Sequence, residues 1–423
     1  MPLKTLLISI VLTSVYIPFI SGQNITIEEC QVKAEANYPA IAMYDIIEKT
    51  KEFNIANANK AYFPQGSFIA QGTWQSDVTS IDLEVPGFQL PTIDRDQFRV
   101  VAELNQLIWD GGRVSAQKNS IEVNAELDKR QLNNEIYTLK ERVNNLYFGV
   151  LLIKEQLNQL GILEKELQRN YDNVKAYMQN GVANESDLMI VRVERLKARQ
   201  QRTNLESNLM AYIQMLSVLI GEELNSDMVF VKPDPGITTI LPIINRPEIL
   251  MFEAQENALE SQKSLLNAGV MPTIGAFAQG GYGKPGLNMF DNQFNPYFLG
   301  GVRLTWNFSN LYTLKSDIRK IDLQKSAVNS RREIFLQNLN IVIPQQQIEI
   351  EKYRKTMQDD EEIIRLHTQI RETTEIKVEN GTMTVSDLMK EIIAEESAKQ
   401  AKVLHEIQFL MSVYSLKYIT NQN

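Results

Sequence analysis

The sequence predicts an α+β membrane protein with long coiled-coil helices, four β-strands per chain and an internal duplication. Three observations predict this fold. The segment 180–189 returns at 380–389, with Asn-Gly and Ser-Asp-Leu-Met in the same places. An apolar heptad pattern precedes the first copy, and a pair of period-two segments lies upstream of each copy. Repetition at one spacing indicates that the two segments are equivalent parts of one duplicated design.

We therefore divide the chain into a leader, two repeats and a linker. Residues 1–22 combine a basic start, an apolar stretch and a small-residue exit, which is typical of a signal peptide; an uncleaved anchor is the alternative. The first repeat is 23–220, the linker or equatorial segment is 221–246, and the second repeat is 247–423. No internal run is long and apolar enough for a transmembrane helix.

Composition narrows the classes of function. The 423-residue chain has a formal net charge of −9 and lacks a basic patch, which argues against a nucleic-acid partner. Cys30 is the only cysteine, so no disulfide forms within the chain, and His367 and His405 do not make a metal-ligand pattern. We expect no cofactor and no metal. The acidity fits either a solvated surface or the lining of a cation-favouring pore.

The first repeat opens with a helix and a strand pair. Thr26 and Glu29 form a capping box, and the helix should run to about Lys60 with a kink at Pro39. A β-hairpin is expected over 66–108, because apolar side chains alternate with polar ones before and after a loop at 77–95. The polar side of these strands fits either a solvated sheet face or the wet lumen of a barrel.

A rod-like helix is expected over 112–178. Its apolar residues alternate in steps of four and three, the coiled-coil spacing, with Glu164 as the one polar position. At 1.5 Å per residue the helix would be roughly 100 Å long. The apolar positions are Leu132, Ile136, Leu139, Val143, Leu146, Val150, Ile153, Leu157, Leu160, Leu167, Tyr171, Val174 and Met178.

A tight tip at 180–187 should reverse the chain into a helix that ends near Ile220. Asn-Gly tolerates positive φ, which suits a helix end. Ser186 and its counterpart Ser386 are residue types that cap helices, and each is followed by an aspartate in the first turn. An ordinary helical hairpin would have the same local sequence.

The second repeat follows the same order. A helix over 247–268 precedes a β-hairpin at 274–308, a helix over 311–378, a tip at 380–387 and a last helix to about Tyr418. The apolar positions of its second strand do not superimpose on those of 98–108 at one offset, so the strand register stays open. Stepping the heptad stripe by 200 residues gives a more polar stripe, and Pro344 should kink the helix. Its polar positions are Gln346, Asp360, His367, Arg371 and Thr374.

Four strands of about ten residues are each long enough to cross a bilayer when tilted. Only a closed barrel leaves no unpaired edge in lipid, and eight strands are the smallest usual barrel. Two copies of the chain would supply eight strands and three copies would supply twelve. Aromatic side chains near the strand ends, such as Trp74, Trp109 and Trp306, suit the girdles of such a barrel, although a soluble sheet is the alternative.

The ordered set of motifs resembles the TolC-type outer-membrane efflux protein family over essentially the whole mature chain. The motifs are Ile27-Glu28-Glu29-Cys30 with the following Ala34 and Asn37-Tyr38-Pro39, the segment Trp109-Asp110-Gly111-Gly112, and the two Gly-x4-Ser-Asp-Leu tips. The resemblance implies a homotrimer whose twelve strands form one barrel in the lipid bilayer of the outer membrane. A periplasmic helical barrel would continue this strand barrel. It also implies docking of a periplasmic adaptor, or membrane fusion protein, and an inner-membrane pump.

The resemblance also implies functional residues at the tips. Asn180, Gly181 and Val182, with Asn380, Gly381 and Thr382, match the turns where adaptors dock. Asp187 and Asp387 match acidic positions at the pore constriction, where a ring of carboxylates would attract cations. The alternative role for these acids is to complement the helix dipole. Lys390 stands where some members have a second acid, and Met383 stands where some have an arginine that helps to hold the tip shut.

These expectations favour a passive exit duct of an efflux or type I secretion system. The duct would carry cargo from an adaptor and pump to the exterior, in the outer membrane of a bacterium and extending into the periplasm. The alternative is a non-channel periplasmic coiled-coil adaptor or spacer, which should have one helical hairpin rather than two. An enzyme is not expected, because no catalytic triad, metal-site or phosphate-loop pattern occurs.

Overall fold

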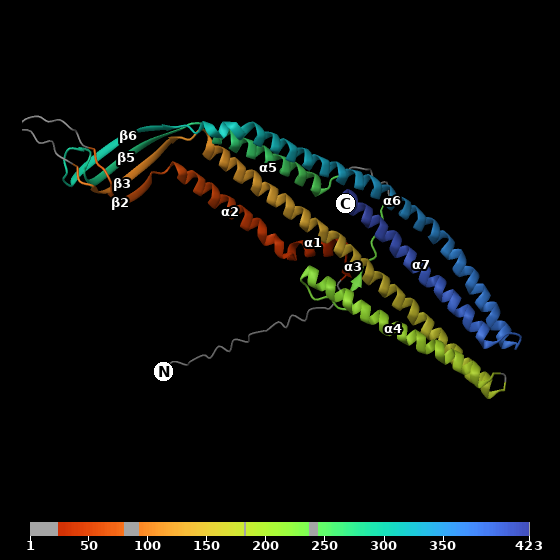
Figure 1. Ribbon diagram of the computed structural model, residues 1–423. Coiled ribbons are helices and arrows are strands. Elements are labelled where there is room, and N and C mark those ends of the chain that lie inside the picture. Colours follow the sequence, from red (N-terminus) through yellow and green to blue (C-terminus); the bar gives the residue numbers. More distant parts are fainter. Residues whose placement is uncertain (1–23, 80–92, 182, 237–243, 423) are drawn as a thin grey trace, which may run out of the picture.

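The computed structural model describes residues 24–79, 93–181, 183–236 and 244–422. The predicted signal peptide, Val182 and residues 237–243 of the predicted linker lie outside the described residues. Within these ranges, no helix combines the length and apolar character needed to cross a membrane. Figure 1 shows an elongated molecule with a sheet at one end and two helical tips at the other.

Long helices make up most of the molecule (Figure 1). The first predicted helix is split at Pro39 into α1 (Ile27–Asn37) and α2 (Ala42–Asn59), with a 3-10 turn at Pro39–Ile41 between them. The other helices are α3 (Arg113–Gln179), α4 (Glu185–Ile220), α5 (Pro247–Gly269), α6 (Leu311–Glu379) and α7 (Val385–Thr420). α6 continues through Pro344 as one helix.

The predicted four strands form one antiparallel sheet. Its order is β2 (Gln65–Trp74), β3 (Asp96–Trp109), β5 (Thr273–Lys284) and β6 (Asn295–Thr305). The expectation that the last strand reaches Phe308 is wrong, because β6 ends at Thr305. The Asn307 side chain accepts a hydrogen bond from Ser309 N and starts a 3-10 turn at Phe308–Asn310.

The sheet fixes the register that the sequence left open. Phe68, Ala102, Gly280 and Phe298 share one rung, so apolar and small side chains occupy one face. The next rung places Ser67, Glu103, Gln279 and Leu299 on the other face. On that face Gln279 donates to Glu103 at 2.9 Å, and the Arg99 guanidinium donates to Gln71. The sheet therefore has one apolar and one largely polar face.

The helices form a single layer whose order changes along its length. Beneath the sheet, neighbouring helices follow the order α2-α3-α5-α6, and toward the tips they follow α4-α3-α7-α6. β1 (Asn24–Ile25) pairs with β4 (Val229–Phe230) to form a two-stranded parallel ribbon. β4 of this ribbon contacts α3. The Tyr147 hydroxyl of α3 holds it by donating to Ile25 O and Val231 O.

Heptad packing buries the predicted stripe of α3. Val143, Val150, Leu160 and Leu167 are fully buried against α1, α4 and α7. The stripe of α6 also faces α7, and two of its polar positions, Asp360 and Thr374, are buried there. Asp360 Oδ2 lies 2.8 Å from His405 Nδ1 of α7, for example. Asp360 and Thr374 therefore belong to the helix contact, whereas Gln346, His367 and Arg371 are half-buried.

Candidate functional site: the tips and the polar cluster above them

Each tip ends its first helix with Asn-Gly. Asn180 and Asn380 are the C-cap residues of α3 and α6, and the following Gly181 and Gly381 have φ values of +74° and +68°. This left-handed conformation favours glycine. No atom lies within 4 Å of a Cβ built on either glycine, so the turns protrude freely. Figure 1 shows the two tips side by side at the end of the molecule farthest from the sheet.

The predicted N-caps are wrong by two residues. The caps are Asn184 and Thr384, whereas Ser186 and Ser386 occupy the second position of each helix. The cause is the capping box, in which the third helical residue hydrogen-bonds back to the cap. Asp187 N donates to Asn184 Oδ1 at 3.0 Å, and Asn184 N donates to Asp187 Oδ2 at 3.0 Å.

The second tip has the same box with one addition. Thr384 donates to Asp387 Oδ2 through both its backbone N–H and its hydroxyl. The Lys390 ammonium lies 3.2 Å from Asp387 Oδ1. The hydroxyl, the N–H and the ammonium hold the pKa of Asp387 below its ordinary value. Ile190 occupies the place of Lys390 in the first tip, so the two predicted constriction residues differ in their immediate charge environment.

Above the tips, an apolar cluster joins the two helical hairpins. Val174 of α3 and Val191 of α4 belong to one buried cluster with Val378 of α6 and Leu388 and Ile392 of α7. Burial of apolar surface is the dominant favourable contribution to such contacts. The two tips are thus held together in a single copy of the chain.

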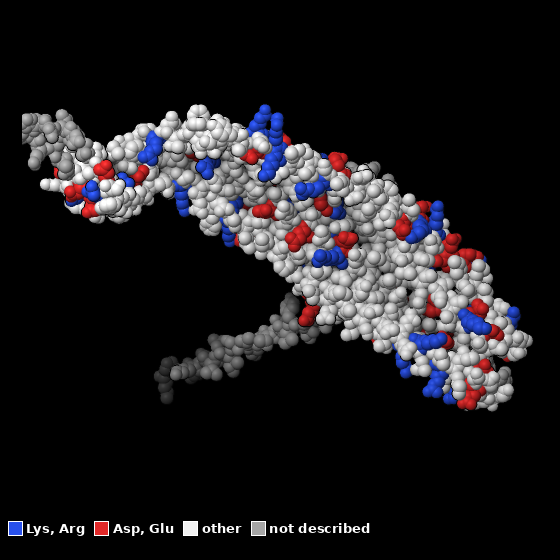
Figure 2. Space-filling view, in the orientation of Figure 1, with Lys and Arg blue, Asp and Glu red and all other residues white. Residues whose placement is uncertain are grey.

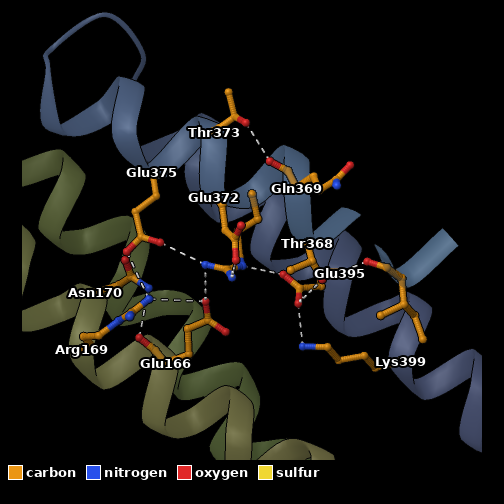
Figure 3. A network of polar contacts seen from close by, with 12 residues as sticks. Glu166, Arg169, Asn170, Thr368, Gln369, Glu372, Thr373, Glu375, Glu395 and Lys399 are labelled. Carbon is orange, nitrogen blue, oxygen red and sulfur yellow. Dashed lines mark hydrogen bonds and ion pairs between the residues drawn. The ribbon is translucent and has the colours of Figure 1, made fainter. Parts of the chain in front are cut away.

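A cluster of polar side chains lies farther from the tips, around Arg371. At 1.5 Å per residue, Arg371 is about 15 Å from Gly381 along the helix. Arg371 of α6 donates to Glu395 of α7 at 2.5 Å and to Glu375 at 3.0 Å. Figure 3 shows Glu375, Glu395, Thr368 and Lys399 of this cluster. Thr368 and Lys399 also contact the Glu395 carboxylate, at 3.0 and 2.7 Å. Burial opposes ionisation of Glu395, but its contacts with Lys399, Arg371 and Thr368 outweigh it and lower the pKa.

The sequence pattern had indicated only part of this cluster. The second heptad stripe contains Arg371 as a polar position, but no pattern in the sequence identifies its partner Glu395. The internal repeat is the signal that relates Arg371 to Glu395. The residues 200 positions earlier are Tyr171 and Arg195, and the Arg195 guanidinium lies 4.7 Å from the Tyr171 ring centre. The two hairpins therefore use equivalent positions for a cation–π contact in one case and an ion pair in the other.

Glu396, next to Glu395, is buried with Gln400 as its hydrogen-bond partner. Burial raises its pKa, Gln400 and Lys399 act in the opposite direction, and Glu166 and Glu395 add to the rise. A carboxyl whose folded pKa is raised favours folding below its unfolded pKa, and this contribution is lost as the pH rises through the folded pKa.

We therefore expect Glu396→Gln to stabilise the protein at neutral pH. The gain should be about 1.4 kcal/mol for each unit by which the pKa is raised, and it should vanish in acid, where Glu396 is protonated. Thermal unfolding of both proteins between pH 4 and 8 measures the difference. Glu391→Gln, on the same helix but less buried, is the control. An equal shift for both variants at all pH values would contradict the prediction.

The described residues contain no group of acidic, histidine and cysteine side chains that could hold a metal ion. On the face shown in Figure 2, basic and acidic side chains are interspersed along the helices. This distribution gives no extended basic patch on that face of the kind that binds nucleic acid.

Comparison with known proteins shows what the chain is similar to. Residues 32–222 match the sequence model of the outer membrane efflux protein family. The fold is similar to that of CusC, a protein described as forming a transmembrane channel, with 13% identity, a TM-score of 0.69 and coverage of 93% of this chain and 91% of that one. No curated protein sequence gives a significant match.

Two outer membrane channels from identified bacteria also have similar folds. The CmeC channel of Campylobacter jejuni has 13% identity and a TM-score of 0.66 over 94% of this chain and 85% of that one. The MtrE channel of Neisseria gonorrhoeae, in its open state, has 13% identity and a TM-score of 0.66 over 93% and 88%. At this level of identity the likeness shows a shared fold.

Proposed function

Because the chain belongs to the TolC-like outer membrane efflux protein family, whose members are non-enzymatic outer-membrane channels, we propose that three copies of it form one passive exit duct. The duct would receive cargo from a periplasmic adaptor and an inner-membrane pump, in a tripartite efflux or type I secretion system. A non-channel periplasmic adaptor or spacer remains the competing function.

The open edges of the sheet are the observation that carries this proposal. β2 and β6 lie at the two ends of the strand order, and neither has a second partner among the described strands. One sheet face carries Phe68, Val100, Val302 and Leu304 in exposed positions, as lipid contact requires. Backbone groups at an open edge cannot remain unpaired in lipid, so β6 of one copy must pair with β2 of the next. Three copies give a twelve-stranded barrel.

The helical layer has open edges at the same two sides. A short 3-10 turn joins β6 to α6, and another joins α2 to β2, so both helical edges continue from the strand edges. Ile334, Ile341 and Ile348 of α6 are seven residues apart and 56, 61 and 69% exposed, on the side away from the buried stripe. This heptad spacing is typical of a coiled-coil contact. We assign these three isoleucines to a seam between copies.

The other side of the seam would be the opposite edge of the next copy. α4 exposes Met189, Val193, Leu196 and Met210 along its length, and a shallow apolar groove beside α3 is lined by Leu146, Met215, Val218 and Leu219. Contacts of one edge with a different edge are head-to-tail, and they close into a ring when the rotation between copies closes. The helices of three copies would then continue the barrel as a tunnel, with α3 and α6 each about 100 Å long.

The tips would close this tunnel and dock the adaptor. Asn180, Gly181, Asn380, Gly381 and Thr382 occupy the turns, where all five are exposed. Their position at the far end from the sheet suits contact with periplasmic partners; Val182 belongs to the same proposal. We also assign Asp187 and Asp387 to carboxylate rings at the constriction, with part of the Asp387 charge offset by Lys390.

Native mass and conductance test the proposed duct. The mature protein, extracted from membranes in mild detergent, should have the mass of three chains and should form ion-conducting channels in planar bilayers. A water-soluble monomer that needs no detergent would overturn the duct and favour the periplasmic adaptor or spacer.

Asp387→Asn should lower the cation preference of the channel. A monovalent cation and a carboxylate 4 Å apart interact by about 1 kcal/mol in water, so the loss of three carboxylates should reduce the cation-to-anion permeability ratio severalfold. Reversal potentials in a salt gradient measure this ratio. Asp359→Asn, which removes an exposed charge from α6 far from the tip, is the control. Equal ratios for the two variants would place the selectivity elsewhere.

A further inference from the structure

The loop between β5 and β6, residues 285–294, exposes apolar side chains at the end of the sheet farthest from the helices (Figure 1). Leu287, Met289 and Phe290 are 58, 53 and 57% exposed, and Phe294 is 48% exposed. We call these four side chains the loop patch. An exposed apolar group of this kind marks a surface that contacts another protein, a ligand or a membrane.

The Phe294 ring shows toward which face of the sheet the loop turns. It stacks on Tyr282, with ring centres 5.6 Å apart and planes at 19°, and its centre lies 6.3 Å from that of Phe98. Along their strands, Tyr282 and Phe98 stand two and four positions from the rung that contains Phe68 and Phe298. Even steps keep side chains on one face. The loop is therefore turned toward the apolar face of the sheet.

Polar groups of the loop find partners within it. The Asn288 side chain accepts a hydrogen bond from Phe290 N at 3.1 Å. The Asp291 carboxylate accepts from Gln293 N at 3.2 Å and from the Asn295 amide at 2.7 Å. Such side-chain turns satisfy backbone donors locally. This suits a segment next to lipid, where water does not replace a missing hydrogen-bond partner.

Polar contacts also attach the loop to the first hairpin. Lys284, the last residue of β5, forms an ion pair with Asp94, which lies two residues before β3. The backbone N–H of Asp94 donates to the Asn292 side chain at 3.2 Å. The loop is thus held in its turned position from two sides, by these polar contacts and by the Phe294 stack.

The length of β5 places the loop patch near the outer boundary of a bilayer. β5 has 12 residues, which at about 3.4 Å each and a tilt of about 40° give a height of roughly 30 Å. The apolar band of a membrane barrel is about 25 Å tall. Phe98 and Tyr282, at the end of the sheet beside the loop, would then lie where aromatic side chains are enriched in membrane proteins.

We propose that the loop patch inserts into the outer leaflet of the lipid bilayer, so that this loop anchors the outer end of the duct and leaves its mouth uncovered. The proposal rests on the duct proposed above. Lipid is the occupant because the apolar face that carries Phe298 continues through Tyr282 to Phe294 without a polar side chain between these rings. The lipid that covers the sheet therefore reaches the loop.

Fluorescence quenching by brominated lipid tests this contact. The full chain, in a Cys30→Ala background, receives a bimane label at Phe290→Cys and is reconstituted in phosphatidylcholine vesicles whose acyl chains are brominated near the headgroup. Phe298→Cys reports on the apolar face of the sheet, and Thr382→Cys reports on a helical tip far from it. The labels at Phe290→Cys and Phe298→Cys should lose fluorescence relative to vesicles without bromine, whereas the label at Thr382→Cys should keep it.

The two positions separate the loop contact from the duct. Quenching at Phe298→Cys without quenching at Phe290→Cys would overturn the loop contact and leave the duct standing, with the loop in water or over the mouth. Quenching at Phe290→Cys alone would support the loop contact and overturn the barrel. An absence of quenching at both positions would overturn both proposals.

The Phe294 stack provides a second test that does not depend on the label's own affinity for lipid. Phe294→Ala removes the ring that holds the loop against Tyr282, so quenching at Phe290→Cys should fall. Phe294→Tyr keeps the ring and should preserve quenching. Unchanged quenching at Phe298→Cys in both variants shows that the sheet is intact. Equal quenching at Phe290→Cys in Phe294→Ala and Phe294→Tyr would mean that the label alone enters the lipid, which would overturn the proposal.

Discussion

Replacement of Ile341 by aspartate is expected to split the assembled trimer. Ile341 lies at the centre of the exposed stripe on α6, seven residues from Ile334 and from Ile348. Burying an isoleucine contributes about 1.5–3 kcal/mol, and a closed ring of three copies contains three seams. The substitution removes this contribution from each seam and places a carboxylate in an apolar contact, which carries a further desolvation cost. Native mass in mild detergent should show monomers at temperatures where the parent is a trimer.

Asn340→Asp supplies the control for this experiment. It adds the same charge one residue away, at an exposed polar position of α6. Its trimer should dissociate at nearly the parental temperature. Equal loss of trimer in the two variants would mean that added charge alone is responsible, and a trimer of parental stability in Ile341→Asp would remove the α6 stripe from the seam.

Gly111→Ala is expected to damage the junction between the sheet and α3. Gly111 has a φ of +69°, and a Cβ at this position would lie 2.3 Å from Met271 Cβ and 3.2 Å from Pro272 O. The left-handed conformation costs a non-glycine residue roughly 1–2 kcal/mol. Overpacking adds typically 1–3 kcal/mol, and here the clash involves backbone and a Cβ, which cannot rotate away. We expect a loss of about 2–5 kcal/mol, measured by thermal unfolding of the helices in detergent.

Gly112→Ala distinguishes the clash from the conformation. Gly112 also has a positive φ, +84°, but no atom lies within 4 Å of its built Cβ. Its replacement should therefore cost only the conformational part, about 1–2 kcal/mol. Both variants keep the Asp110 carboxylate, which accepts hydrogen bonds from Gly112 N and Val114 N at the start of α3. Equal destabilisation would show that contact with Met271 is unimportant.

The long helices could be predicted closely because each depends on one repeated local pattern. The α3 stripe from Leu132 to Val174 is buried largely as the heptad spacing predicts, and the capping box at Thr26 is present. The N-caps were misplaced because serine and threonine or asparagine are all suitable cap types. Reciprocal hydrogen bonds decided between them, since Asp187 and Asp387 select Asn184 and Thr384 by lying three residues later.

The strand register and the polar cluster around Arg371 depended on the tertiary structure. Alternation assigns side chains to the two faces of a strand but does not select the partner rung, so the neighbour of Phe298 was not determined until β6 paired with β5 at Gly280. Similarly, Arg371 could be placed on a heptad stripe, whereas Glu395 and Glu166 come from helices far away in sequence. The sequence by itself determined the helices, the strands and the two tips, because these follow from local spacing. Only the tertiary structure decided which charges meet, because ion pairing depends on the distance between side chains in space.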